Sequence, residues 1–302
     1  MNLKTLVLGL FSIALITSCN NFDAENELNG NAADIRSALG TNPPIQTFMV
    51  DTDNFIIVTS NDNVISAEPG SFVFPDGSVF NGIINFSVLE LFNKSDIVRY
   101  GFQTLTNDGQ ILTSDGEFNF FAVADDQELQ LAAGAFLNLT ILSEEPVRDA
   151  FLFNLSDDET WNLIDSTALN VVDSLGSGDG LGYQTALSSM DWVNVDYFTK
   201  FDLQLSEVPV QLPDGYNGSN TLVYAIFSDR DIVLLIPYNE TDFFSANLPV
   251  GEEVNLVAIA AEDSGNFRMD NTVYNIDGED EVNLDPKSTD LESVIEYLES
   301  LD

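Results

Sequence analysis

The stretch Gly82-Ile-Ile-Asn-Phe-Ser-Val-Leu-Glu-Leu91 is the segment that decides the fold class. Polar and apolar residues alternate from Asn85 to Val88, as they do when one face of a strand is buried and the other is exposed. Branched and aromatic residues, which favour strands, dominate the segment. The turn signal Pro75-Asp-Gly77 precedes it. We therefore predict a β-strand over 82–91.

Similar strand-like segments recur on both sides of this strand, separated by short turn signals. Asn107-Asp-Gly109 and Asp115-Gly116 are two of these signals. Many short strands separated by turns, with few helical patterns, indicate a β-sandwich, which we place at residues 44–155. The other strands predicted there are 45–50, 54–60, 97–104, 117–124 and 135–141.

A second strand-rich region follows a Ser/Gly/Asp-rich stretch. We interpret residues 156–190 as a flexible loop or linker and residues 191–285 as a second β-sandwich, immunoglobulin-like or fibronectin-like in size. The fully apolar Ile232-Val-Leu-Leu-Ile236 suits a central strand. The strands predicted in this domain are 197–205, 221–227, 232–237, 253–260 and 272–276.

Residues 286–302 are expected to form a C-terminal amphipathic helix. Thr289-Asp-Leu-Glu292 has the spacing of a capping box, and apolar residues then recur at helical spacing. The predicted fold is therefore all-β, with two β-sandwich domains and this helix packed on the second one. The residues of its apolar stripe are Leu291, Val294, Ile295, Leu298 and Leu301.

The first eighteen residues are interpreted as a lipoprotein signal peptide. Lys4 precedes an apolar run of about eleven residues, which is shorter than the roughly 20 that span a bilayer. Ile16-Thr-Ser-Cys19 resembles the lipobox, and Cys19 is the only cysteine. We expect cleavage before Cys19 and its modification with diacylglycerol and an N-acyl chain such as palmitate. The alternatives are a retained short anchor and an ordinary secretory signal.

Residues 19–43 are predicted to be a lipidated tether between the lipid and the first domain. The segment is polar and Asn-rich, as disordered linkers are, with one turn of helix expected near 33–39.

The chain is strongly acidic, with 50 Asp and Glu against 9 Lys and Arg and a formal net charge of −41. No basic patch can neutralise phosphates, so nucleic acid is excluded as a partner, and anionic headgroups are disfavoured. The charge fits solubility in a salty habitat. The alternative is Ca²⁺ binding, with the metal site unknown: Asp173–Gly180 and Asp277–Glu281 come closest to a calcium loop but lack its spacing.

Several motifs resemble those of envelope and surface lipoproteins of Bacteroidetes that carry two β-sandwich modules. They are Pro69-Gly-Ser-Phe72, the strand from Ile83 to Leu91, and Trp192-Val-Asn-Val-Asp-Tyr-Phe198. The resemblance implies an outer-membrane location, and acidic residues soon after Cys19 resemble a surface-export signal. It implies no catalytic residue. The alternative interpretation of these motifs is purely structural: Trp192 and Phe198 would fill a core, and Glu117 would lie at a sheet edge.

The chain offers little catalytic chemistry. It has no histidine, which excludes Ser-His-Asp and Cys-His machinery, and it has no phosphate-binding glycine loop. We therefore expect no enzyme and no cofactor. Asp165-Ser166-Thr and Asp173-Ser174-Leu resemble the O-glycosylation pattern of exported Bacteroidetes proteins, so Ser166 and Ser174 are candidate glycosylation sites.

These observations favour a lipid-anchored cell-envelope protein that acts as a structural or binding module. Its expected partners are the membrane, through the lipid on Cys19, and envelope proteins or extracellular polymers. Two alternatives stay open: a Ca²⁺-dependent adhesion module, and a carbohydrate-active enzyme that uses two carboxyl groups.

Overall fold

The computed structural model describes residues 30–302 except 144, 157–158, 173–180, 202–203, 240–242, 264 and 279–280. The structure is mostly β, with 49% of residues in strands and 10% in helices, and a helix lies at its C-terminus. The predicted β class and the C-terminal helix are confirmed at this level. Residues 1–18, with the predicted signal peptide, lie outside the described part.

The largest sheet has seven strands and contains the strand predicted over 82–91. The neighbouring strands are antiparallel, and the order is β1-β5-β6-β14-β10-β11, with β7 beside β6. Their bounds are β1 (Gln46–Asp51), β5 (Ile83–Leu91), β6 (Leu112–Ala124), β7 (Gln127–Glu128), β10 (Ala150–Leu155), β11 (Trp161–Leu163) and β14 (Val193–Phe198).

A five-stranded antiparallel sheet lies opposite, in the order β12-β13-β9-β3-β2. Its strands are β2 (Ile56–Val58), β3 (Val64–Ala67), β9 (Leu137–Leu142), β12 (Asn170–Val172) and β13 (Gly182–Leu187). Strands β4 (Phe72–Val73) and β8 (Gln130–Leu131) pair with each other, and the short 3₁₀ helix η1 spans Thr52–Asn54.

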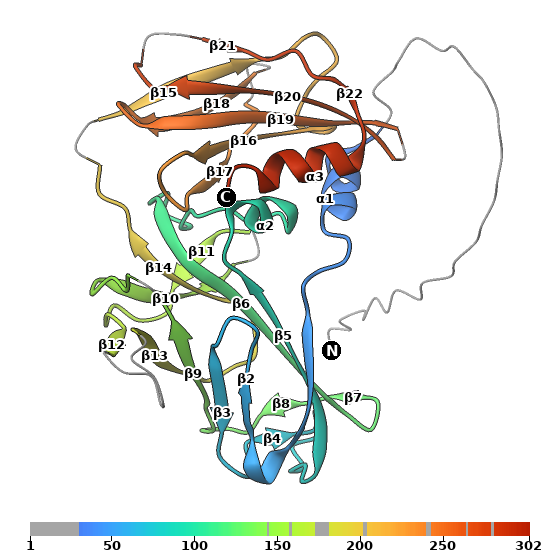
Figure 1. The fold of residues 1–302 in the computed structure, drawn as a ribbon, viewed down its shortest axis with the longest axis vertical. Helices are drawn as coiled ribbons and strands as arrows, with labels where there is room; N and C mark the ends of the chain where they lie inside the picture. Colours follow the sequence, from blue (N-terminus) through green and yellow to red (C-terminus); the bar gives the residue numbers. More distant parts are fainter. Residues whose placement is uncertain are drawn as a thin grey trace, which may run out of the picture.

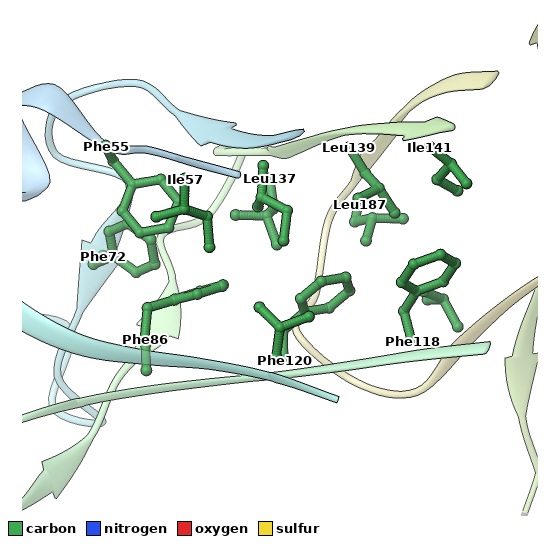
Figure 2. Packing of buried hydrophobic residues seen from close by; sticks show 14 of the residues in the cluster. Phe55, Ile57, Phe72, Phe86, Phe118, Phe120, Leu137, Leu139, Ile141 and Leu187 are labelled. Carbon is green, nitrogen blue, oxygen red and sulfur yellow. The ribbon is translucent and has the colours of Figure 1, made fainter. Parts of the chain in front are cut away.

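The first hydrophobic core fills the space between these two sheets. Figure 2 shows Phe86, Phe118 and Phe120 pointing from one layer toward Leu137 and Leu139 of the other. All five side chains are buried to within 2% exposure. The alternation in β5 therefore has the predicted cause, because Phe86 and its in-phase neighbours enter this core.

Two further sheets form the other end of the molecule. One is three-stranded, with order β18-β15-β21, and the other is five-stranded, with order β17-β16-β19-β20-β22. A second buried core contains residues from both sheets. The strands are β15 (Leu205–Gln211), β16 (Thr221–Phe227), β17 (Val233–Leu235), β18 (Phe244–Pro249), β19 (Glu253–Asp263), β20 (Asn266–Asn275), β21 (Val282–Asn283) and β22 (Lys287–Thr289).

A third core joins the two ends. Three helices, α1 (Ala32–Leu39), α2 (Lys94–Arg99) and α3 (Leu291–Glu299), lie between the upper and lower sheets in Figure 1. Strands β16 and β19 are buried on both faces, because one face enters the second core and the other meets this helix layer. The helices contribute Ile35, Leu39, Ile97, Val98, Val294 and Leu298 to the third core.

Two predicted segments have a different structure. The strand predicted over 97–104 is wrong: this region begins within α2, and Ile97 and Val98 are buried in the third core. Branched residues suggested a strand, but packing against α3 and β17 favours a helix. The strand predicted over 197–205 is likewise displaced, because the observed strand is β14, 193–198.

The predicted domain limits remain predictions, but three segments lie elsewhere than we expected. Residues 156–190, interpreted as a loop, contribute β11, β12 and β13 to the first two sheets. Strand β14, which we expected in the second domain, lies between β6 and β10 in the seven-stranded sheet. Within the predicted tether, α1 is docked, with Ile35 and Leu39 at most 1% exposed.

The cap of the C-terminal helix is shifted by one residue from the prediction. Thr289 ends β22, and Asp290 is the N-cap: its side-chain oxygen accepts the backbone N–H of Ser293 at 2.8 Å. Val294 and Leu298 are fully buried, and the other stripe residues pack against the same core. The amphipathic face is therefore confirmed, with α1, α2 and β20 as its neighbours.

Candidate functional site

A polar groove of about 1040 Å³ opens where the first two sheets meet α2. It is formed by the start of β1, the turn between β2 and β3, the end of β5 and the residues that lead into α2. Its volume is at the upper end of the range typical of small-molecule sites. Its lining residues are Pro44, Ile45, Gln46, Ser60, Asn61, Asp62, Glu90, Phe92, Asn93, Asp96 and Leu142.

Glu90 organises the floor of this groove. Its side chain is buried, and its carboxylate accepts four hydrogen bonds, two at each oxygen. Thr59 Oγ1 and Asn63 Nδ2 donate to Oε1 at 2.8 and 2.6 Å. Gln46 Nε2 and Asn61 Nδ2 donate to Oε2 at 2.9 Å each. Because hydrogen bonds to a charged acceptor are strong, this network holds three separate chain segments in place.

The donors around Glu90 are themselves fixed by further hydrogen bonds. Gln46 Oε1 accepts the N–H of Ser60 at 2.6 Å, and Asn63 Oδ1 accepts the N–H of Leu142 at 2.8 Å. Asp62 adopts a left-handed backbone, φ 62°, which aspartate tolerates better than most residues. The turn that lines the groove is therefore preorganised by β1, β5 and β9.

The charge of the groove restricts its ligands. Asp62, Glu90 and Asp96 line it, and none of the lining residues is basic. Burial raises the pKa of Asp96, while the nearby Arg99 lowers it. An anionic ligand would meet these carboxyl groups with no basic side chain in the lining to bind it. Neutral polar or cationic ligands suit the groove.

We did not predict Glu90 as a site residue, although its position in the sequence carries a signal. Glu90 follows Phe86 and Val88 at a spacing of two, so the alternation that predicts the strand also directs Glu90 inward. An acidic residue in the buried phase of a strand indicates a polar network or a site.

Two other carboxyl groups are fully buried on neighbouring strands. Glu117 of β6 lies opposite Asn194 of β14, and Asp196 lies opposite Ser114. Both acids are 0% exposed. The prediction that Glu117 lies at an edge is wrong, because β6 is flanked by β5 and β14 and the helix layer covers this face.

The environment of these two acids strongly favours their neutral forms. Burial raises the pKa of Glu117 well above its usual value, and the neighbouring Asp196 adds to the effect. Burial likewise raises the pKa of Asp196, with Asp115 nearby, although the polar side chains of Ser114 and Asn194 favour the charged form and oppose the shift.

The predicted modification sites are only partly covered by the structure. Cys19 and Ser174 lie outside the described residues. Ser166 is exposed in the connection between β11 and β12, where the Asp165 carboxylate accepts the N–H and hydroxyl of Thr167 at 3.0 Å each. Its hydroxyl lies on an accessible turn, so Ser166 stays a candidate glycosylation site.

The described residues offer neither a cluster of metal ligands nor a membrane-spanning helix. They contain no group of three or more carboxylate, histidine or cysteine side chains arranged to hold a metal ion. Across the same residues, no helix combines the length and apolarity needed to cross a bilayer.

Comparisons with protein-family models, curated proteins and solved structures gave no match to this chain.

Proposed function

We propose that this chain is a lipid-anchored cell-envelope protein of the Bacteroidetes outer-membrane type, whose β-structure is a binding module rather than an enzyme. The lipobox-like Ile16-Thr-Ser-Cys19 supports the anchor, and the absence of histidine from the sequence supports a non-catalytic role. We keep the membrane, envelope proteins and extracellular polymers as its proposed partners, and display on the cell surface as its proposed location.

We further propose that both pairs of facing sheets are β-sandwiches and that the second is immunoglobulin-like or fibronectin-like. The second core supports this arrangement, because Val208 and Val210 of β15 are buried with Val223 and Leu256 of the five-stranded sheet. The size of this region also fits such a module.

The observation that carries the binding role is the preorganised groove around Glu90. Saccharide hydroxyls donate and accept hydrogen bonds, so a site built from fixed amide, hydroxyl and carboxylate groups suits them. The lack of basic lining residues disfavours sulfated or uronic polymers. We therefore propose a neutral glycan segment as the ligand of the groove.

Asn93 provides a sharp test of this proposal. It lines the groove, it is exposed, and its side chain makes no capping hydrogen bond to α2. Asn93→Ala should therefore leave the melting temperature unchanged and weaken glycan binding about tenfold, the expected effect of one lost hydrogen bond. The measurement is calorimetric titration of the full-length mature protein in detergent with neutral oligosaccharides chosen from an array.

Asn81→Ala is the matched control, because Asn81 is exposed and does not line the groove. Equal loss of affinity in both variants, or no binding to any neutral glycan, would refute the proposed ligand. Release of reducing ends, abolished by a single Asp or Glu substitution, would instead support the carbohydrate-active enzyme.

The anchor is tested separately. Cys19→Ala should move the protein from the membrane fraction to the soluble fraction after cell lysis, because the acyl chains are its proposed attachment. Retention of the variant in the membrane fraction would refute the lipoprotein assignment without affecting the glycan proposal.

A further inference from the structure

The carboxyl groups of Glu117 and Asp196 form an unusual pair within the seven-stranded sheet. They lie on the adjacent strands β6 and β14, where the strand register shifts between Asn194 and Asp196. Such a β-bulge redirects side chains locally and often accompanies a functional site. The bulge includes Gly116 at φ 136°, where a Cβ would lie 2.5 Å from the Phe92 ring.

Three oxygens of this pair have no hydrogen-bond partner among the residues that the structure describes. They are both carboxylate oxygens of Glu117 and Oδ1 of Asp196. The remaining oxygen, Asp196 Oδ2, accepts Asn194 Nδ2 at 2.7 Å. A buried carboxylate without donors is unfavourable, so these two acids must either be protonated or bind a cation.

The described residues supply no such partner. None of the ion pairs found among them includes Glu117 or Asp196. The charged neighbour that acts on Asp196 is Asp115, which has the same sign. The buried Lys94 donates to the carbonyl oxygens of Phe227 and Ser228 instead. Neutralisation must therefore come from protons or from a bound cation.

We propose that Glu117 and Asp196 bind a Ca²⁺ ion between β6 and β14. A divalent ion balances two carboxylates, and an all-oxygen ligand set selects a hard cation. The amide oxygen of Asn194 and the hydroxyl of Ser114, which hydrogen-bond to each other at 3.4 Å, provide neutral oxygens beside the pair. Mg²⁺ is disfavoured, because it retains several waters and both carboxyl groups are fully shielded from solvent.

This site differs from the loop sites that the sequence suggested. It contains two carboxylates rather than three, in agreement with the lack of larger acidic or histidine clusters in the described residues. The ion would hold β6 to β14 at the bulge. The adjacent Ser114 N–H donates to the carbonyl of Asp231 at 3.0 Å, so the ion would also support the contact with the second half of the chain.

The test is metal analysis and thermal melting of the full-length mature protein. We expect about one equivalent of calcium by mass spectrometry after purification without chelator. We also expect the melting temperature to fall in EDTA and to recover by about 5 °C or more with CaCl₂ at 100 times Kd. An equal recovery with MgCl₂ would overturn the assignment to Ca²⁺.

Matched variants locate the effect. Glu117→Gln keeps the shape of the side chain and removes the charge, so this variant should lose bound calcium and the CaCl₂-dependent shift. Asp126→Asn, at an exposed turn with φ 59°, should retain both. If Glu117→Gln does not fold, the metal content and EDTA response of the unmodified protein still decide the question.

Less than 0.1 equivalent of any divalent metal, with the same melting temperature in EDTA and in CaCl₂, would overturn the proposal. The two carboxyl groups would then be neutral acids. The same conclusion would follow if Glu117→Gln retained the calcium shift. Neither result depends on the glycan proposal, since the groove and the carboxyl pair use different residues.

Discussion

At the scale of single residues, buried polar groups divide into paired and unpaired ones. Glu90 has four hydrogen-bond donors, and the buried indole of Trp161 donates to the carbonyl of Gln103 at 2.9 Å. The hydroxyl of Tyr224, in contrast, is buried and finds no hydrogen-bond partner in the described part of the chain. The paired groups hold segments together, whereas the unpaired hydroxyl costs stability because it has lost its hydration.

Replacing Tyr224 with Phe should therefore stabilise the protein by about 1 kcal/mol, since it removes the unpaired hydroxyl and keeps the ring. Urea unfolding at pH 8 measures the change. Tyr216→Phe is the contrasting variant: the Tyr216 hydroxyl donates to the carbonyl of Pro286 at 3.2 Å, so its loss should destabilise. Opposite signs for the two variants are the expected result, and a loss of stability in Tyr224→Phe would contradict it.

The same tyrosine gives a pH prediction. Burial raises the pKa of Tyr224 from 10 to about 12. The folded protein holds this proton more tightly than the unfolded chain, so the contribution of Tyr224 to stability should be constant below pH 10 and fall between pH 10 and 12. Tyr224→Phe should reduce the loss by on the order of 1 kcal/mol per pH unit. Urea unfolding curves of both proteins at pH 8, 10 and 11 measure this difference. An identical dependence of stability on pH in Tyr224→Phe and the unmodified protein would refute the prediction.

At the scale of elements, the helices are where local sequence and tertiary packing disagree. The capping-box spacing favours Thr289 as the N-cap of α3. Thr289 is instead the last residue of β22 and pairs with Phe267 of β20, so Asp290 is the first residue free to cap the helix. Strand pairing therefore decided the helix start. In α2, burial of Ile97 and Val98 overrode their preference for strands.

Asp290→Ala should lower the melting temperature at pH 7, and Asp290→Asn should largely preserve it, because asparagine also caps helices. Hydrogen bonds from Ser293 lower the pKa of Asp290 below 3.8. The stabilisation is thus present above that value and lost as the pH falls through the lower folded pKa, so the difference in melting temperature from Asp290→Ala should shrink as the pH falls below 3.8. A larger fall in melting temperature for Thr289→Ala than for Asp290→Ala at pH 7 would instead support the predicted capping box at Thr289.

At the scale of the whole molecule, the third core makes the two ends dependent on each other. Its buried side chains come from α1, α2, α3, the seven-stranded sheet and the face of β16 and β19 that meets the helices. Backbone hydrogen bonds cross the same contact, including Thr104 N–H to the carbonyl of Val233 at 2.8 Å. Helix α1, which lies in the segment predicted to be a tether, is therefore part of this shared core.

Calorimetry should accordingly show a single unfolding transition, with equal calorimetric and van't Hoff enthalpies, because unfolding either end exposes the shared core. Ile35→Ala should move the whole transition down, at a cost of roughly 2–5 kcal/mol, because Ile35 is fully buried in that core. Ser37→Ala, on the exposed side of α1, is the control. Two separated transitions would show that the ends unfold independently.

The sequence by itself determined the strand class, most strand positions, the amphipathic face of α3 and the lipobox-like N-terminus. These features depend on local periodicity or on adjacent residues, so they can be read without the fold. The tertiary structure alone decided the groove, because the partners of Glu90 lie 27 to 44 residues away along the chain. It also decided the pairing of Glu117 with Asp196 and the docking of α1, since burial depends on what covers a residue and strand register depends on which strands meet.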